Sequence, residues 1–294
     1  MNAQIARFKQ YLIYEKGLSP KSVEAYLHDA LLLEDFLGDK KMEDATFEDL
    51  QQFLKHLYQS DYNARSQARI ISGMRAFYRY LIYANVLETD PTELLDAPKI
   101  GMHLPDVLTV EEIQRIMEVI DLSTPEGHRN RAMAEVMYGC GLRVSELCAM
   151  KTEDIIADGE LLRVIGKGSK ERIVPIGSAA GRALVAYLAS ARDVFTKGDL
   201  SIGHVFVTRL KKPFTRQAVF KLIRERALAA GIAPERISPH VLRHCFASHM
   251  LQHGADIRAI QELLGHADIG TTQIYTHVDA TRFGDIHRRF HPRG

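Results

Sequence analysis

The sequence predicts a mainly α-helical protein with a small β-sheet in its second half, an α+β fold in two domains. Residues 1 to about 95 contain only helical patterns. The short runs LLRVIG and ERIVPI, at 161–166 and 171–176, are rich in β-branched residues and typical of strands. Between the two halves, DAPKIGMHLPDVL holds two prolines and a glycine. We therefore expect domains at residues 1–97 and 109–294, joined by a linker at 98–108.

The composition is that of an ordinary soluble globular protein. The chain has 294 residues, of which 46% are hydrophobic and 26% charged. No apolar run approaches 18 residues, and the N-terminus lacks the features of a signal peptide, so we expect a cytoplasmic protein without a membrane span. The net charge of +1 means that any DNA-binding surface must arise from local segregation of charge. The three cysteines have no CxxC spacing, which indicates reduced, buried thiols at Cys140, Cys148 and Cys245.

Four amphipathic patterns in the first half predict four helices. The last differs because four arginines share one side of it, opposite the apolar side chains that would face the core. An arginine face is often only solvated surface, but this one includes no lysine and no acid, which favours contacts to DNA phosphates. The expected helices span residues 2–16, 19–37, 46–60 and 63–84, and the arginines are Arg65, Arg69, Arg75 and Arg79.

A second basic surface is expected in the second half. Residues 209–226 hold seven lysines and arginines, and only Glu225 opposes them. Such a segment suits the DNA backbone. The candidate contacts are Arg216 and Lys221. A further strand is expected at His204–Thr208.

Arg143 lies in the segment GLRVSEL, where glycine permits close approach of the backbone and the leucines are expected in the core. An arginine so close to a core is costly unless an anion meets it. The anion could be a bound phosphate, or it could be Glu146, in which case Arg143 would be purely structural. Lys167 lies in the turn KGSK between the two expected strands, at the tip of a hairpin.

The stretch from Ser238 to His277 gathers the remaining candidates. Ser238-Pro239 predicts a helix start, so that the next two turns carry His240, Arg243 and His244 on one face. A second helix is expected at 257–264, ended by Gly265-His266, and Tyr275 follows. Two histidines, an arginine and a tyrosine are the composition of a phosphate site with a phenol nucleophile. Zinc binding by His240 and His244 is disfavoured, because the metalloprotease signature needs a glutamate where Val241 stands.

Six positions, each in its local motif and in the same order, resemble the tyrosine recombinases of the phage integrase family, and the whole chain is similar to the Xer type. The resemblance implies a C-shaped clamp, in which a helical core-binding domain and a catalytic domain close round duplex DNA. Cys245 departs from the family pattern, which often has serine or threonine there. The implied active-site residues are Arg143 in GLRVSEL, Lys167 in GKGSKER, His240 and Arg243 in HVLRH, His266 in LLGH and Tyr275 in TTQIYTH.

The residue types fit this chemistry. Two guanidinium groups can hold the two non-bridging oxygens of a phosphodiester. A tyrosine with a pKa near 10 needs a proton acceptor, for which His240 is suited, and Lys167 can protonate the departing 5′ oxygen. The product would be a 3′-phosphotyrosyl link, from which strand exchange proceeds through a Holliday junction. His266 would donate a hydrogen bond to the phosphate. No metal or cofactor is expected.

The resemblance implies site-specific recombination that resolves chromosome dimers at cell division. The expected partners are a DNA target with two half-sites, further protomers in a tetrameric synapse, and a septal DNA translocase. The alternatives are an integrase of a mobile element, a type IB topoisomerase-like activity, a catalytically idle DNA-binding protein and a metal-dependent hydrolase. In the tail at 277–294, an apolar stripe is expected to dock on a neighbouring protomer, as similar recombinases do; it consists of Phe283, Ile286 and Phe290.

Overall fold

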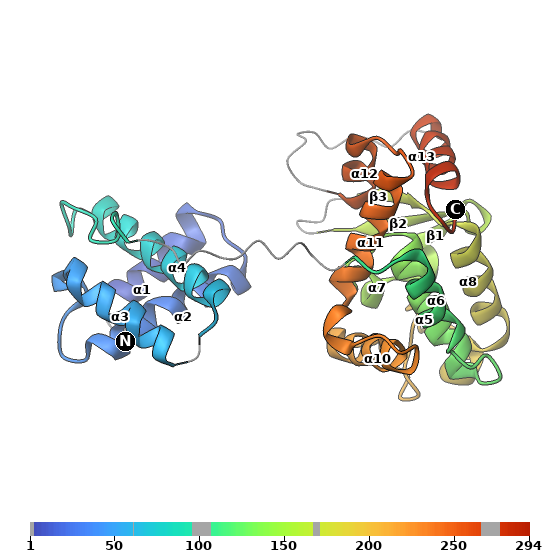
Figure 1. Cartoon of the computed structure of the whole chain (residues 1–294), viewed down its shortest axis with the longest axis horizontal. Helices are drawn as coiled ribbons and strands as arrows, with labels where there is room; N and C mark the ends of the chain where they lie inside the picture. The colour runs from blue at the N-terminus through green and yellow to red at the C-terminus, as the bar shows by residue number, and fades with distance from the viewer. Residues whose placement is uncertain (1–2, 61, 96–106, 167–170, 266–276) are drawn as a thin grey trace. The chain divides into compact units, whose positions relative to one another are not determined.

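The computed structural model describes residues 3–60, 62–95, 107–166, 171–265 and 277–294, and for residues 277–281 the backbone alone. The chain divides into two compact units, Met1–His103 and Leu104–Gly294 (Figure 1). Among the described residues, no helix is both long enough and apolar enough to span a membrane.

The described part of the first unit is helical, which confirms the four expected helices. The starts follow the sequence signals, since the side chains of Ser19, Thr46 and Asn63 each accept a hydrogen bond from the first turn. The first helix changes into one turn of π-helix at Tyr11–Glu15. The helices are α1 (Ala3–Gln10), α2 (Pro20–Leu37), α3 (Phe47–Gln59) and α4 (Ala64–Tyr83), with a 3₁₀ turn at Met42–Asp44.

The apolar face of α4 forms the centre of the core of this unit. Phe77 meets Phe8 of α1 edge-on, with ring centroids 5.3 Å apart. Tyr78 is buried and donates its hydroxyl to the carbonyl of Met42 at 2.9 Å. The other face of α4 is left for the arginines.

The second unit combines helices with a small sheet, so the expected α+β class is confirmed. Its helices are α5 (Val110–Glu118), α6 (Pro125–Gly139), α7 (Val144–Ala149), α8 (Ser178–Ser190), α9 (Arg192–Thr196), α10 (Arg216–Ala229), α11 (Pro239–Gln252), α12 (Ile257–Leu264) and α13 (His277–Phe290); its strands are β1 (Ile155–Ile156), β2 (Leu161–Ile165) and β3 (Glu171–Pro175). Short 3₁₀ turns lie at Thr152–Asp154, Ala157–Gly159 and Pro234–Arg236.

Within the described residues the strands form one antiparallel sheet in the order β1-β2-β3. The pairing of β2 with β3 runs from Leu161–Pro175 to Ile165–Glu171, so these two strands form the arms of the expected hairpin. Its tip, residues 167–170 with Lys167, lies outside the described residues. The expected strand at His204–Thr208 is wrong, because this segment makes only isolated bridges, at His204 and Val207, in the described structure. Its backbone bonds go to separate segments at Met150 and Lys212, so no continuous ladder forms.

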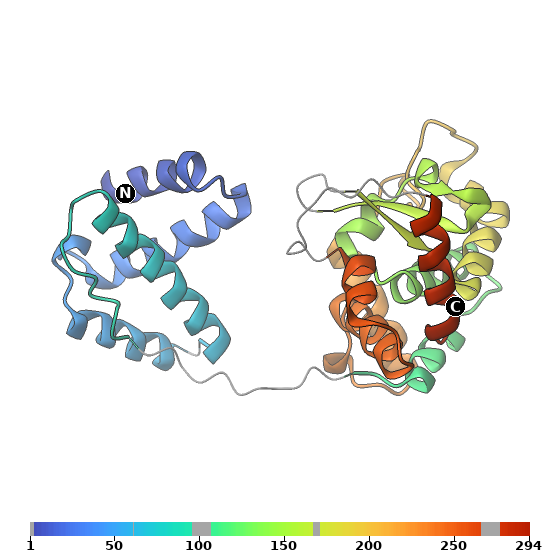
Figure 2. The ribbon, with the colours of Figure 1, turned by 90° about the horizontal axis from the view of Figure 1, so that it is seen from above.

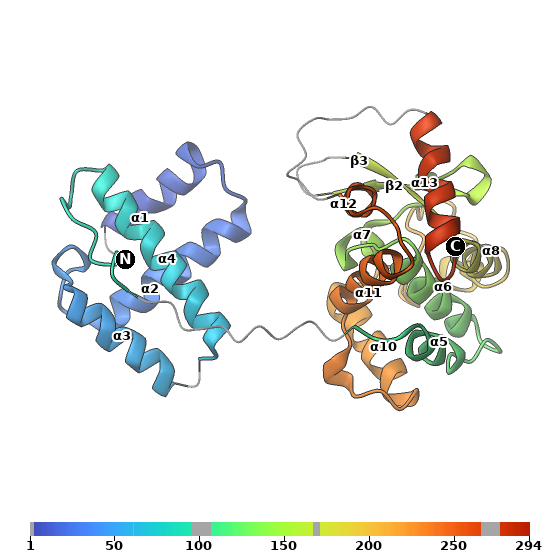
Figure 3. The ribbon, with the colours of Figure 1, turned by 45° about the horizontal axis from the view of Figure 1, so that its top comes forward.

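Helix α6 is the centre of the second core. Its residues from Ala132 to Gly139 are all buried, and it packs against α8 on one side and α11 on another (Figure 3). Cys140 and Cys245 are buried beside it, as expected, whereas Cys148 is only half-buried.

The C-terminal helix α13 packs on its own unit, beside β3 and α11 (Figure 2). Phe283 is buried, and the partly buried Ile286 and Phe290 pack against the same core. His287 is also buried, with its Nε2 2.7 Å from the carbonyl oxygen of Gly139. In this single chain, therefore, the apolar stripe is covered in cis, which differs from the expected docking on a neighbour; docking in trans stays a prediction.

An ion pair fastens the end of the tail. Both Nε and Nη2 of Arg293 donate to the carboxylate of Glu135 on α6, at 2.7 and 2.5 Å. The Glu135 side chain is only 2% exposed. Burying a carboxylate is costly without cationic partners, so Arg293 offsets part of this cost, together with Arg131.

Replacing Arg293 with alanine is expected to destabilise the isolated protein, because Glu135 then keeps, among the described residues, only Arg131 as a cationic partner. We expect a loss of about 2 kcal/mol in the free energy of unfolding, seen as a fall of about 5 °C in melting temperature. Arg288→Ala is the matched control, since Arg288 pairs with Asp285 at the surface and should shift melting by no more than about 1 °C. Equal melting of the two variants would show that the tail is not docked in cis in solution.

Candidate active site

The structure describes three of the six expected catalytic residues. Arg143 precedes α7, and His240 and Arg243 lie in the first two turns of α11. Lys167, His266 and Tyr275 lie outside the described residues. The described part of the candidate site therefore consists of the two arginines, His240 and the groups that hold the arginines.

Glu146 fixes the start of α7 and the side chain of Arg143 together. Its Oε2 accepts the backbone N–H of Arg143 at 2.8 Å, which caps the helix. Its Oε1 accepts Nη1 of the same arginine, also at 2.8 Å. Glu146 is thus an anion that meets Arg143, which is one of the two alternatives that the sequence left open.

The same carboxylate meets two more arginines. Arg172 of β3 donates Nη1 and Nη2 to its two oxygens, each at 2.8 Å, as a bidentate fork. Nη1 of Arg243 lies 3.8 Å from Oε2. Burial alone would raise the pKa of Glu146, but the hydrogen bonds from Arg172 and Arg143 lower it to about 2. The carboxylate is therefore ionised at neutral pH.

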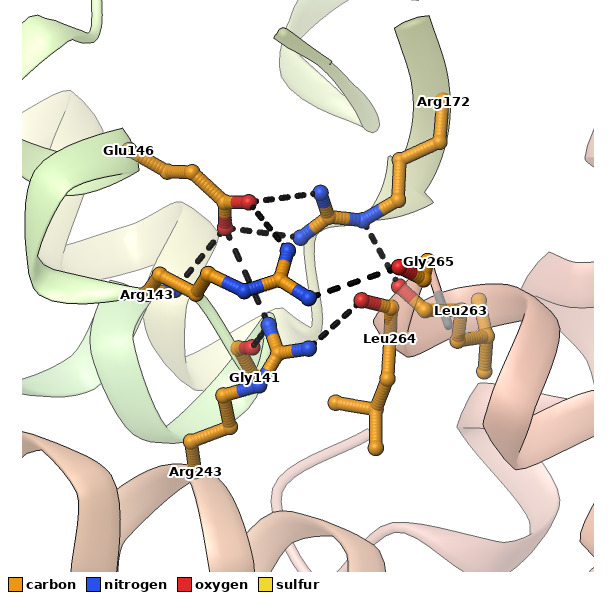
Figure 4. Close-up of polar contacts among 8 residues, drawn as sticks. All are labelled: Gly141, Arg143, Glu146, Arg172, Arg243, Leu263, Leu264 and Gly265. Carbon is orange, nitrogen blue, oxygen red and sulfur yellow. Dashed lines mark hydrogen bonds and ion pairs between the residues drawn. The ribbon is translucent and has the colours of Figure 1, made fainter. Parts of the chain in front are cut away.

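The C-terminal end of α12 provides the second set of acceptors for these arginines. Leu263 O accepts Nε of Arg172 at 2.9 Å, Leu264 O accepts Nη2 of Arg243 at 2.5 Å, and Gly265 O is 3.4 Å from Nη2 of Arg143. Figure 4 shows the three guanidinium groups between Glu146 and these consecutive carbonyls. The last carbonyls of a helix lack partners within it and carry partial negative charge, so guanidinium groups satisfy them well.

Two glycines with positive φ permit this approach. Gly141 has φ of +58°, and a β-carbon there would lie 2.8 Å from the Phe246 ring; its carbonyl accepts Nη1 of Arg243 at 2.7 Å. Gly265 ends α12 with φ of +66°, and a β-carbon would lie 3.0 Å from Cδ of Arg172. Any larger residue would strain the backbone and displace the groups that hold the arginines.

The charges of this cluster leave it suited to an anion. Among the described residues, three guanidinium groups meet one carboxylate, which leaves an excess of two positive charges. Burial, and then the neighbouring Arg143 and Arg172, lower the pKa of Arg243 to about 10, so it stays charged at neutral pH. The side chain of Arg143 is 34% exposed, against 10% for Arg243 and 5% for Arg172. Arg143 is therefore the guanidinium most open to a ligand.

The histidines of α11 differ in their surroundings. His240 is exposed in the first turn, behind Ser238, whose hydroxyl accepts the backbone N–H of Val241 at 3.2 Å. His244 is half-buried, with Nε2 3.5 Å from the hydroxyl of Ser248. In the part of the chain that the structure describes, no group of three or more potential ligands could hold a metal ion.

The arginine face of α4 is less uniform than the sequence indicates. Nη1 of Arg69 donates to the buried carboxylate of Asp29 on α2 at 2.7 Å, and Nη2 of Arg75 donates to the carbonyl of Leu95 at 2.6 Å. Arg65 and Arg79 are exposed on the same helix.

The basic residues of α10 are at the surface. Arg216 is exposed at its first turn, and Lys221 lies 3.9 Å from Glu225, with both side chains largely in solvent. So loose a contact leaves Lys221 available to a ligand.

Arg172 is the member of the cluster that the sequence analysis missed. The signal was present, because Arg172 and Val174 are two residues apart in ERIVPI and both point inward from β3. A charged residue at an inward position of a strand indicates a buried partner. The pattern did not say which residue that partner was.

Comparison with known proteins shows the family to which the chain belongs. The model of the phage integrase family matches residues 106–282, and that of the phage integrase N-terminal SAM-like domain matches residues 5–85. Tyrosine recombinase XerD of Staphylococcus aureus (strain Mu50) is 39% identical over 296 residues, covering 100% of both chains.

Solved structures show the same fold. The XerH site-specific recombinase bound to a palindromic difH substrate has a TM-score of 0.71 at 20% identity, covering 96% of this chain and 83% of that one. A lambda integrase tetramer bound to a Holliday junction has a TM-score of 0.71 at 20% identity, covering 94% and 79%. The chain therefore belongs to the phage integrase family of DNA recombinases and is a tyrosine recombinase of the Xer type.

Proposed function

We propose that this recombinase cuts and rejoins DNA at a specific site through a 3′-phosphotyrosyl intermediate, and that it resolves chromosome dimers at cell division in the cytoplasm. The observation that carries the chemistry is the pair of guanidinium groups, Arg143 and Arg243, held together beside the buried carboxylate of Glu146. Two fixed guanidinium groups suit the two non-bridging oxygens of one phosphodiester.

In the cleavage step, the phenol oxygen of Tyr275 forms a bond to phosphorus while the bond from phosphorus to the 5′ oxygen breaks. The phenol proton goes to His240, and Lys167 supplies a proton to the 5′ oxygen. Arg143 and Arg243 stabilise the charge on the non-bridging oxygens, and His266 donates a hydrogen bond to the phosphate. The position of His266, directly after the carbonyls that hold the arginines, supports its role.

Joining is the reverse of cleavage. The bond energy of the broken strand is kept in the phosphotyrosyl link, so the 5′ hydroxyl of a partner strand can attack it without a nucleotide cofactor. Two such exchanges pass through a Holliday junction, the DNA to which the similar lambda integrase is bound as a tetramer. We infer a synapse of four protomers on two DNA sites, each with two half-sites.

The domain roles follow the same proposal. Residues 1–97 would bind one side of the DNA core site and residues 109–294 the other, with 98–108 as the linker of a C-shaped clamp. The exposed Arg65 and Arg79, with Arg216 and Lys221, would contact phosphates. In the synapse, the tail at 277–294 would give up its contacts with its own unit and make contacts with a neighbouring protomer. A septal DNA translocase would activate the reaction.

Replacing Tyr275 with phenylalanine is expected to abolish covalent attachment to DNA while half-site binding is kept. The test uses a nicked duplex carrying a site that the chain itself selects from random sequence. Wild-type protein should give a denaturant-resistant protein–DNA band, and the variant none. The same band from Tyr275→Phe would refute the assignment of Tyr275 as the nucleophile.

Replacing Lys167 with alanine should slow cleavage by about 10²- to 10⁴-fold, the usual contribution of a positioned acid. Substituting sulfur for the leaving 5′ oxygen should restore the rate, because a thiolate departs without protonation. Lys170→Ala, in the same turn, is the matched control and should cleave both substrates at near wild-type rates. Rescue of Lys170→Ala instead would move the general acid to that residue.

Replacing Arg79 with alanine should weaken DNA binding and lower the slope of log K against log salt by about one. Lys55→Ala, at an exposed position of α3 outside the arginine face, should leave the slope unchanged. Arg69→Ala is expected to lower thermal stability as well, since it leaves Asp29 buried and unpaired. An unchanged slope for Arg79→Ala would make that side chain ordinary surface.

A further inference from the structure

The contact between Arg143 and Glu146 raises a difficulty for catalysis. A guanidinium neutralised by its own carboxylate binds a phosphate poorly, because the carboxylate repels the incoming anion. Both oxygens of Glu146 are in use by Arg143, one for the side chain and one for the backbone N–H. Some other cation must balance Glu146 if Arg143 is to act on DNA.

Arg172 has the position to be that cation. It is 5% exposed at its side chain, so it is not itself available to DNA, and its fork covers both oxygens of Glu146 at 2.8 Å. Its Nε also donates to Leu263 O at 2.9 Å, which fixes the plane of the guanidinium. A buried, fully engaged arginine of this kind holds charge in place without binding ligand.

We propose that Arg172 is a positioning residue of the recombination reaction: it balances the charge of Glu146, so that Glu146 orients Arg143 without neutralising it. This inference rests on the proposed function of Arg143. Arg172 would not touch the DNA and is not a catalytic residue.

Counting charges shows what its loss would do. With Arg172 present, three guanidinium groups and one carboxylate leave an excess of two positive charges for the phosphate. Without it the excess falls to one, and among the described residues the carboxylate keeps only Arg143 and the more distant Arg243 at 3.8 Å. The ion pair between Arg143 and Glu146, which already exists at 2.8 Å, would then neutralise Arg143, and its role would be purely structural.

The same side chain joins two segments that carry other active-site residues. Arg172 stands on β3, five residues after Lys167, and its acceptor Leu263 stands three residues before His266. Its bond to Leu263 therefore links the strand of the hairpin to the end of α12. Displacement of either segment would misplace groups that must act together, which costs rate more than binding.

The first test replaces Arg172 with methionine, which keeps the length and packing of the side chain without its charge. We expect single half-site binding to stay within about threefold of wild type, and cleavage of the nicked duplex to fall on the order of 100-fold, as for the loss of one electrostatic stabiliser. Arg163→Met is the matched control: Arg163 stands on the neighbouring strand β2 and pairs with Asp154, away from the cluster. It should cleave within about twofold of wild type.

The second test separates charge balance from simple loss of structure. Glu146→Gln is added to Arg172→Met, so that the carboxylate that needs balancing is gone and two positive charges remain. We expect this double variant to cleave about tenfold faster than Arg172→Met alone, a coupling that a double-mutant cycle measures. If Arg172 had a merely structural role, the reductions in cleavage caused by Arg172→Met and by Glu146→Gln would add in the double variant. A double variant no faster than Arg172→Met overturns the proposal.

Folding is checked by circular dichroism at the assay temperature. If Arg172→Met does not fold, Arg172→Lys takes its place; lysine keeps the charge without the fork, and cleavage should fall about tenfold with binding kept. A loss of cleavage of 100-fold or more by the folded Arg172→Lys variant, in which the charge is retained, would show that charge balance is not what Arg172 provides and would overturn the proposal. Failure of the wild-type protein to form a covalent adduct would instead refute the proposed function, which keeps the two outcomes distinct.

Discussion

The candidate active site depends on the contacts that the carboxylate of Glu146 makes with three arginines. This carboxylate is 4% exposed and meets the side chains of Arg143 and Arg172 at 2.8 Å, with Arg243 at 3.8 Å. A buried carboxylate is stable only with such partners, and buried guanidinium groups are stable only with anions and carbonyls. Each group thus accounts for the presence of the others, and the excess positive charge that remains is available to a phosphate.

Two glycine conformations and one helix end in the backbone support this cluster. Gly141 and Gly265 take left-handed conformations that let Phe246 and Arg172 approach closely, and their carbonyls accept hydrogen bonds from Arg243 and Arg143 respectively. The end of α12 presents three successive carbonyls to three arginines. Backbone carbonyls therefore hold the three guanidinium groups in place, which suits a transition state that requires fixed positive charge.

Much of the fold could be predicted from the sequence, because caps and periodicity are local signals. Ser238 and Gly265 bound their helices as expected. The contacts that escaped prediction join distant segments: Arg172 reaches Glu146 over 26 residues and Leu263 over 91, and Arg69 reaches Asp29 over 40. A pattern of inward and outward positions indicates that such side chains are buried, but it does not identify the partner across the fold.

We propose that Arg143 and Arg243 each neutralise a different non-bridging oxygen of one phosphate. The most direct test is cleavage of DNA in which a methyl group replaces one non-bridging oxygen of the scissile phosphate, with the two stereoisomers separated. Removing that oxygen removes the need for the arginine facing it. Arg143→Ala should regain cleavage with one isomer and Arg243→Ala with the other. Rescue of both variants by the same isomer, or of neither by any, would contradict this account.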